Sequence, residues 1–588
     1  MTAGGELPAF LGVEASLTGR RWCGPNLQLE RSTEALVQAT DLPAPLCAVL
    51  AQRGVPATQV DSFLAPALRD LLPDPRSLRD MEDAARIWLE AAQSGKRIAV
   101  FADYDVDGGS SAALLIDWLR QVGAPAPTLY VPDRIDEGYG PNAPAIQSLA
   151  QSHDLIVCVD CGTLSHDALA AAAPVPVLVL DHHLGADTLP DVAAVVNPNR
   201  QDEDSSLGHL CAAAVVFLML VEAGRQMREA GQRGPDLLKM LDLVALATVA
   251  DVAPLKGVNR AFVRQGLQVM RGRERPGLTA LSEVAAINTP PEAYHLGFLL
   301  GPRVNAGGRV GKADLGARLL ATASPDEASA LAERLDLLNK ERREIEASVT
   351  QQARTQAEER DPQAALIWAA GDDWHPGVVG IVAARLKEAY NRPAVVIGFD
   401  AEGTGKGSGR SVSGVDLGAA IQAMALDGQI EKGGGHRMAA GLTLTRDQLA
   451  PAMAQLSAHL ARQGAHLRGP NDLHLTAPLF PAAVTPELIE QVERAGPFGA
   501  SAPAPRFALP DLSVLNARRV GEDHLKLSIG DRGGHRLDAI CFGAFRTALG
   551  EALENAGSAR FHFAGRLELN AWGGRVSPQL RLEDAAPA

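Results

Sequence analysis

The chain has 588 residues, 46% of them hydrophobic and 21% charged, and carries a formal net charge of −15. This length and composition indicate a globular protein of two to four domains, and the acidic balance argues against a nucleic-acid coat protein. A nuclease is still compatible with the charge, because bound cations offset clustered carboxylates.

The six cysteines are scattered, apart from one Cys-x-x-Cys pair, Cys158 and Cys161. This distribution predicts no disulfide framework, and we interpret the pair as packing residues that flank Asp160. The N-terminus lacks a basic-then-apolar signal pattern, and no apolar run reaches the ~18 residues of a membrane span. We therefore expect a cytoplasmic protein without a membrane partner.

Residues 1–85 are proline-rich and helical in places, and we interpret them as an N-terminal extension without a recognisable catalytic or binding motif. From Lys96 onward, short apolar runs end in polar groups: "KRIAVFADYD", "PTLYVPDR", "HDLIVCVD" and "PVPVLVLDHH". Alanine-rich segments of helical length lie between them, which indicates a parallel sheet with helices on both faces. We expect this α/β domain to span residues 86–322. Its acidic groups should converge at one edge, because ligands bind outside the carboxyl ends of such strands.

A glycine-free segment that follows Ser324 and Pro325 has a helical leucine stripe and predicts a connecting helix within residues 323–361. Residues 362–463 then alternate strand, loop and helix, which predicts a second α/β domain. Residues 471–588 contain strand-like runs with glycine-rich turns, as in a small β-barrel. From Asp511 onward this tail has ten acidic and ten basic residues and is neutral.

The stretch "FADYDVDGGSS" places carboxylates at every second position, directly after a predicted strand. Carboxylates at close range resist ionisation unless a cation neutralises them. Mg²⁺ and Mn²⁺ take oxygen ligands, and Mn²⁺ also accepts imidazole. We therefore predict a catalytic site for two such ions, held by Asp105, Asp107, Asp160, His182, His183 and Asp251. Asp103 is a further ligand or an acceptor that orients one.

Two glycine-rich stretches in the second domain predict phosphate contacts. "GSGRSVSG" is expected to form a turn in which Ser408, Arg410 and Ser411 cradle a phosphate, although simple chain reversal is the alternative. In "GGGHRMAAG", Gly434 and Gly435 would let the backbone approach a ligand, with His436 as a donor. Further DNA contacts are predicted at Arg303, Asn305 and Arg309, and at Trp572, which either stacks on a base or anchors a turn.

The ordered motifs "DYDVDG", "VDCG", "DHH" and "VADVAP" resemble those of the DHH phosphoesterases. "EGYGPN", "GPRVNAGGRVG" and the tail "FAGRLELNAWGGRVSPQL" are similar to the RecJ branch, and the resemblance covers about residues 99–582. It implies that the motif carboxylates and histidines bind two Mn²⁺ or Mg²⁺ ions. It also implies a DHH-associated second domain and a C-terminal OB-fold that binds DNA.

The activity that this resemblance implies is 5′→3′ hydrolysis of single-stranded DNA in repair and recombination. Single-strand-binding protein and a helicase are expected as further partners, and a monomer as the oligomeric state. The alternatives are a smaller DHH activity, such as a nano-RNase, a cyclic-dinucleotide phosphodiesterase or an inorganic pyrophosphatase, or a non-catalytic DNA-binding replication factor. The β-rich tail disfavours the first group, and the complete carboxylate set disfavours the second.

Overall fold

The structure, a computed structural model, describes the whole chain except residues 1–7, 134–136, 466–471 and 573. It divides into two compact units. One consists of residues 68–469, and the other combines residues 1–67 with residues 470–588.

The larger unit begins with the predicted parallel α/β sheet, and this part of the fold is confirmed. The strand order is β3-β2-β4-β5-β6, and all pairs are parallel. The strands are β2 (Ile98–Ala102), β3 (Thr128–Tyr130), β4 (Leu155–Val159), β5 (Val177–Leu180) and β6 (Ala194–Val196). The strands β2, β4, β5 and β6 are completely buried, as expected for a sheet with helices on both faces.

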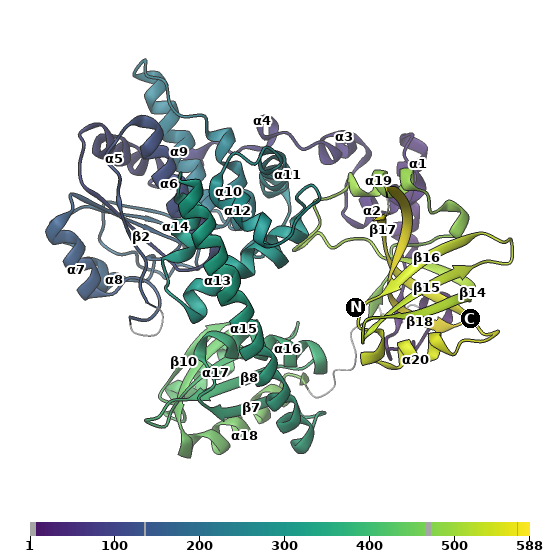
Figure 1. Cartoon of the computed structure of the whole chain (residues 1–588). Helices are drawn as coiled ribbons and strands as arrows, with labels where there is room; N and C mark the ends of the chain where they lie inside the picture. Colours follow the sequence, from purple (N-terminus) through teal and green to yellow (C-terminus); the bar gives the residue numbers. More distant parts are fainter. Residues whose placement is uncertain (1–7, 134–136, 466–471, 573) are drawn as a thin grey trace. The chain divides into compact units, whose positions relative to one another are not determined.

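Helices α7 (Ala143–Ser152) and α8 (His166–Ala170) pack on one face of this sheet (Figure 1). Helices α6 (Val106–Val122) and α9 (Ala212–Glu229) lie side by side against its strands, and α5 (Met81–Gln93) packs on α9. A helical layer follows with α10 (Leu241–Ala250), α11 (Gly257–Arg271), α12 (Pro276–Val284), a π-helix (His295–Leu300), α13 (Gly301–Val310) and α14 (Leu315–Ala321). The short helix α4 (Leu68–Leu71) contacts α11.

The predicted connecting helix is present as α15 (Pro325–Arg360), and the Ser324 side chain caps its N-terminus. It leads into a second sheet of order β10-β11-β9-β8-β7. This part contains β7 (Ile367–Asp372), α16 (Pro376–Tyr390), β8 (Ala394–Phe399), β9 (Thr404–Arg410), α17 (Leu417–Leu426), β10 (Lys432–His436), β11 (Ala439–Thr445) and α18 (Arg446–Arg462).

One local prediction is wrong: the stretch that begins at Gly407 is not a turn up to Arg410. Gly407–Arg410 form the end of β9, which pairs with β8 and β11 over its length. Because glycine has no side chain, side chains from the neighbouring strands can pack closely against the backbone here. A Cβ on Gly407 would lie 2.8 Å from the Ile397 side chain and 3.0 Å from that of Leu442.

The smaller unit contains the predicted C-terminal barrel. Strands β14 (Phe507–Val520), β15 (His524–Gly530), β16 (Arg536–Cys541), β17 (Arg560–Trp572) and β18 (Arg575–Pro587) close into a ring through the β14–β17 pairing. Its other strands and α-helices are β1 (Trp22–Cys23), α1 (Leu27–Ala39), α2 (Ala44–Gln52), α3 (Val60–Leu64), β12 (Leu473–His474), β13 (Ala477–Pro478), α19 (Pro486–Glu493) and α20 (Ala548–Glu554).

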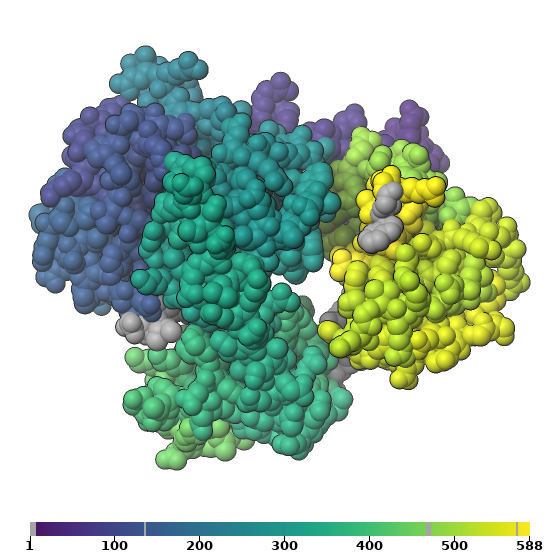
Figure 2. All heavy atoms as spheres, in the orientation of Figure 1, coloured from purple at the N-terminus to yellow at the C-terminus, as the bar shows by residue number. Residues whose placement is uncertain are grey.

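The N-terminal segment is part of this barrel's apolar core. Leu46 and Leu50 of α2 are buried in one cluster with Leu488 of α19 and Phe507 of β14. Strand β1 pairs in parallel with β12, and the Trp22 indole donates to buried Asp584 at 3.0 Å. Figure 2 accordingly shows N-terminal purple atoms beside yellow-green C-terminal atoms. Among the described residues, no helix combines the length and apolarity that a membrane crossing requires.

Candidate metal centre

The ends of three neighbouring parallel strands bring the predicted acidic groups together. Asp103 follows β2, Asp160 follows β4, and the Asp181–His183 segment follows β5. Because these strands are adjacent and parallel, their carboxyl ends meet at one edge of the sheet. Asp251 reaches the same site from the C-terminus of α10.

Two of these carboxylates lie at the start of α6 and are held by backbone amides. The Asp105 side chain caps the helix and accepts from the amides of Asp107 and Gly108 at 2.8 and 3.1 Å. Asp107 accepts at the N-terminus of α9, from the amides of Ala212 and Ala213 at 2.7 and 2.8 Å. Two helix N-termini therefore orient the acidic pair, and their dipoles favour its negative charge.

His182 lies at the centre of the cluster. Its Nε2 is 3.2 Å from Asp160 Oδ1 and 3.7 Å from Asp107 Oδ2, and its Nδ1 is 3.9 Å from Asp251 Oδ2. Three overlapping groups each place their ligand atoms within 4.8 Å of one another: Asp160 with His182 and His183, Asp107 with His182 and Asp251, and Asp103 with Asp105 and Asp160. Overlapping groups of this kind suit two neighbouring ions.

The electrostatics of the cluster favour a proton or a cation at its carboxylates. Burial, followed by the neighbouring carboxylates, raises the pKa of Asp160 well above its ordinary value, and burial likewise raises the pKa of Asp107. The same causes raise the pKa of Asp251 to about 8. The Oδ1 atom of Asp160 is buried and accepts no hydrogen bond from the described part of the chain. Carboxylate oxygens in this state, together with an imidazole, fit Mn²⁺ or Mg²⁺.

His183 differs from His182 because both of its ring nitrogens have partners. Nδ1 lies 2.8 Å from Asp181 Oδ1, and Nε2 lies 3.1 Å from the Tyr139 hydroxyl. Burial opposes charge on His183, but Asp181 outweighs it and raises the pKa of His183 to about 9. Asp181, although buried, has a lowered pKa because His183 and Thr163 donate to it.

Sequence reasoning left Asp181 and Tyr139 out of the predicted site. Asp181 could have been included because it shares a strand end with His182 and His183. The position of Tyr139 in "EGYGPN" does not indicate a role in the site, because only the fold brings this residue to His183.

A cavity of about 430 Å³ opens beside the cluster. It shares His182 and Asp251 with the metal centre and is also lined by Ser205, His209 and Lys256. Asn259 Nδ2 donates to the backbone carbonyls of His209 and Pro254 at 2.8 and 3.1 Å, so one buried amide fixes two walls of this cavity. Lys256, which sequence reasoning missed, adds a cation next to the acidic centre.

A second cavity, of about 370 Å³, is formed by residues of the second sheet, by the start of α16 and by Arg309 of α13. Lys406, Ser408 and Arg410 line it from β9, where alternate residues share one face. Arg410 Nη1 donates to Ser408 Oγ at 2.9 Å, and Arg309 Nη1 donates to the Gly377 carbonyl at 3.1 Å. The sequence gives no signal for Lys406, because the glycine-rich stretch after it predicts a turn.

The other predicted residues of the second domain have different environments. Ser411 is buried, and its hydroxyl donates to the Val415 carbonyl at 2.8 Å. Gly435 lines the cavity with φ +146°, and a Cβ there would lie 2.5 Å from the Ala439 carbonyl oxygen. Gly434 has open space beside it, and His436 is exposed. The side chain of Trp572 lies outside the described residues.

Arg303 and Asn305 hold parts of the protein together. Arg303 pairs with Asp336 of α15 at 2.9 Å and donates to the Leu299 carbonyl at 2.8 Å. Asn305 Oδ1 accepts from the Val106 amide at 3.0 Å and so supports the first turn of α6. Their contact with DNA stays a prediction.

An exposed aromatic pair lies close to the Asp251 end of α10. Tyr294 and Phe298 are 49% and 69% exposed, and their rings stack with centroids 5.1 Å apart. Phe298 belongs to the π-helix, an element often found at functional sites. A Cβ on Gly297 would lie 3.3 Å from the Val249 side chain, which shows how closely this helix approaches α10.

Comparison with known families gives three matches in chain order. Residues 97–248 match the N-terminal domain of the DHH family, residues 363–462 match the DHHA1 domain, and residues 475–584 match the RecJ OB domain.

Curated relatives match nearly the whole chain. The chain is 36% identical to the single-stranded-DNA-specific exonuclease RecJ of Escherichia coli, over 95% of this chain and 99% of that protein. It is 37% identical to the protein of the same name from Dickeya dadantii, with the same coverage. Among solved structures, RecJ in complex with Mn²⁺ from Thermus thermophilus superposes with a TM-score of 0.79 at 29% identity, covering 96% of this chain and 79% of that one.

The strand-end carboxylates and the three matched domains therefore point to one lineage: the chain belongs to the RecJ family of DHH proteins.

Proposed function

We propose that this protein is a metal-dependent exonuclease that degrades single-stranded DNA from its 5′ end in DNA repair and recombination. The observation that carries the proposal is the buried cluster of carboxylates around His182, whose overlapping ligand groups fit two divalent ions. The family relationship supports the substrate, because the relatives are named single-stranded-DNA-specific exonucleases. The Mn²⁺ and Mg²⁺ complexes of the Thermus thermophilus relative support the choice of metal.

We assign the metal ligands to Asp103, Asp105, Asp107, Asp160, His182 and Asp251, which are all the members of the overlapping groups except His183. When bound, two divalent cations activate water and stabilise the charge that develops on the scissile phosphate and the leaving oxygen. The amides of Ala212 and Ala213 hold the Asp107 carboxylate in place for this purpose.

We assign His183 to the substrate phosphate. Its pairing with Asp181 fixes the ring and favours the protonated form, so the imidazolium brings positive charge to the edge of the cluster, with Nε2 beside the Tyr139 hydroxyl. The cavity of Ser408 and Arg410 supplies a second anion site, to which Arg309 and Lys406 add positive charge. We propose that this cavity receives the 5′-terminal phosphate while the next phosphodiester bond lies at the metals.

The test is digestion of a single-stranded oligonucleotide with Mn²⁺, using one batch labelled at the 5′ end and one at the 3′ end. The expected result is immediate release of the 5′ label as mononucleotide, while the 3′ label stays in progressively shorter fragments. Digestion that starts from the 3′ end, or full activity in EDTA, would overturn the proposal.

We also propose that the protein is a cytoplasmic monomer and that single-strand-binding protein and a helicase are partners. The family relationship supports the partners, and six free thiols support a reducing compartment. Light scattering of the purified chain and co-purification with each partner test these points separately.

A further inference from the structure

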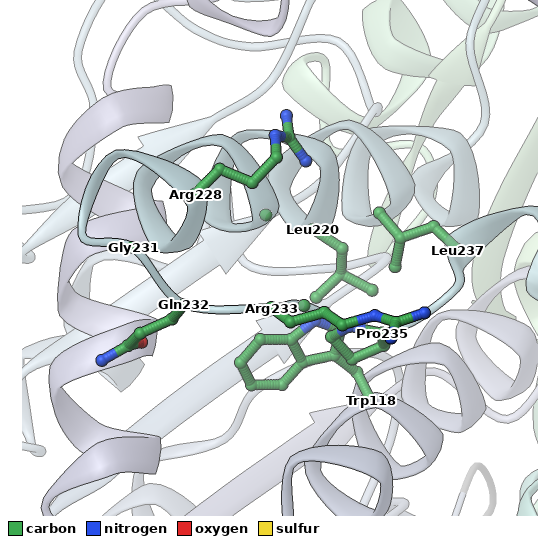
Figure 3. A pocket seen from close by; sticks show the side chains of 10 residues that line it. Trp118, Leu220, Arg228, Gly231, Gln232, Arg233, Pro235 and Leu237 are labelled. Atoms are coloured by element: carbon green, nitrogen blue, oxygen red, sulfur yellow. The ribbon is translucent and has the colours of Figure 1, made fainter.

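A third cavity, of about 430 Å³, lies far from the metal centre along α6 and α9 (Figure 3). Trp118 contributes to it from near the end of α6, Leu220 and Arg228 contribute from α9, and Arg233 and Pro235 contribute from the loop that follows α9. Trp118 is eleven residues beyond Asp107 on the same helix, which corresponds to about 16 Å. A ligand in this cavity would therefore not touch the metal centre.

The floor of the cavity contains a donor without a partner. The Trp118 side chain is 1% exposed, and its Nε1 donates no hydrogen bond to the described residues. An indole N–H can only donate, and a buried donor without an acceptor is unfavourable. The cavity next to this ring can supply the missing acceptor through a bound ligand.

Two guanidinium groups at the cavity have no carboxylate partner among the described residues. Arg228 and Arg233 form no ion pair there, whereas Arg225 on the same helix pairs with Glu222 and Glu229. The nearby Asp236 carboxylate accepts from the Leu238 amide and caps a helical turn. None of the ten lining residues is acidic, although the chain contains 70 acidic residues.

The rest of the wall is apolar, with Leu220, Leu237 and Pro235 around the indole. Figure 3 shows Arg233 extended across the Trp118 ring, Leu220 and Leu237 above it, and the Arg228 side chain rising from α9 away from the ring. The cavity thus combines donors and positive charge with an apolar surface. Its volume is in the range of small-molecule sites.

We propose that this cavity binds a nucleoside 5′-monophosphate, with the phosphate beside Arg233, where Arg228 of α9 adds positive charge, the base against the apolar wall, and an acceptor atom at Trp118 Nε1. The choice within this chemical class rests on the proposed function, because exonucleolytic cleavage that expels a 3′-oxygen releases 5′-mononucleotides. The other end of α9 holds Asp107 through two backbone amides, so the same helix joins the cavity to the metal centre.

The test is equilibrium dialysis of the full-length protein against labelled deoxyadenosine monophosphate in EDTA. We expect saturable binding by the wild type, the loss of one bound nucleotide per chain in the double variant Arg228→Gln/Arg233→Gln, and unchanged binding in Arg354→Gln, an exposed arginine on α15. Trp118→Phe keeps an aromatic ring without the donor and should weaken binding several-fold. Normal nuclease rates with Mn²⁺ would show that each variant is folded.

Equal binding by the double variant and the wild type would overturn the proposal, as would the absence of binding to the wild type. Binding of inorganic phosphate and of deoxyadenosine, each measured alone, distinguishes recognition of the phosphate from recognition of the nucleoside. If phosphate alone binds as tightly as the mononucleotide, the site is a simple anion site and the nucleotide assignment is wrong. Because dialysis needs no catalysis, a failure of the proposed nuclease activity would be detected independently.

Discussion

Asp181 carries the most consequential contacts at the residue scale, although it is absent from all three groups of candidate metal ligands. Its two oxygens accept from Thr163, from the backbone amide of His182 and from the His183 ring. One buried carboxylate thus positions both histidines, which is the usual role of an acidic group behind a metal site.

We expect Asp181→Asn to lower the rate about 10–100-fold, because the loss of such an orienting partner has effects of this size. His182→Ala should abolish cleavage, while the folded protein still binds single-stranded DNA. The measurements are initial rates with Mn²⁺ and DNA binding in EDTA, with exposed Asp187→Asn as the matched control. A His182→Ala variant with appreciable activity would exclude His182 as a ligand.

Metal affinity should depend on pH. Burial and neighbouring carboxylates raise the pKa of Asp251 to about 8 in the metal-free protein, so a cation must displace its proton at lower pH. The apparent Mn²⁺ affinity should therefore rise with pH, about tenfold per unit for each displaced proton, with the contribution of Asp251 levelling off above pH 8. Calorimetric titrations between about pH 6.5 and 8.5 measure this slope, and a pH-independent affinity would contradict it.

Arg410 is the residue that most directly tests the 5′ end-capture hypothesis. A guanidinium binds a phosphate bidentately, so Arg410→Ala should lose most activity on 5′-phosphorylated strands and less on 5′-hydroxyl strands. Initial rates on oligonucleotides that differ only at the 5′ end measure the contrast, with exposed Arg462→Ala as the control. Equal losses on both substrates would assign Arg410 to an internal phosphate or to the structure of β9.

At the scale of single elements, the π-helix before α13 presents an aromatic surface of the kind that stacks on bases. Replacing both Tyr294 and Phe298 by Ala should weaken single-strand binding by about 1–3 kcal/mol for each stacked base, without loss of metal binding. The measurement is DNA affinity in EDTA and Mn²⁺ affinity without DNA. Leu426→Ala, which removes another exposed apolar side chain, is the control. Unchanged DNA affinity would mean that the pair does not contact the strand.

At the scale of the whole molecule, residues 1–67 and 470–588 form one unit and share an apolar core. Deleting residues 471–588 alone would expose Leu46 and Leu50 of α2, so a clean truncation removes both segments. We expect the remaining chain, residues 68–469, to keep its metal sites but to bind long single strands more weakly. Its binding should also depend less on salt, because fewer phosphates are neutralised. Identical affinity to the full chain at two salt concentrations would show that the OB domain does not hold DNA.

The sequence by itself determined the elements whose signals are local. The buried strands were recognisable as continuous apolar runs, and α15 as a long glycine-free stretch with an N-terminal cap. Most of the metal cluster was also accessible, because polar residues that follow neighbouring parallel strands must meet at one edge.

Only the tertiary structure decided which distant segments share a surface. The sequence of β9 predicts a turn, because its glycines interrupt the alternation of inward and outward side chains that is typical of a strand. Its pairing with β8 and β11 shows that it is a strand. The pairing of Tyr139 with His183, the union of α2 with the barrel, and the cavity at Trp118 likewise depend on long-range packing. Such contacts leave no periodic pattern in the sequence. Each segment can form its local secondary structure without its distant partner, and only the folded chain brings the two together.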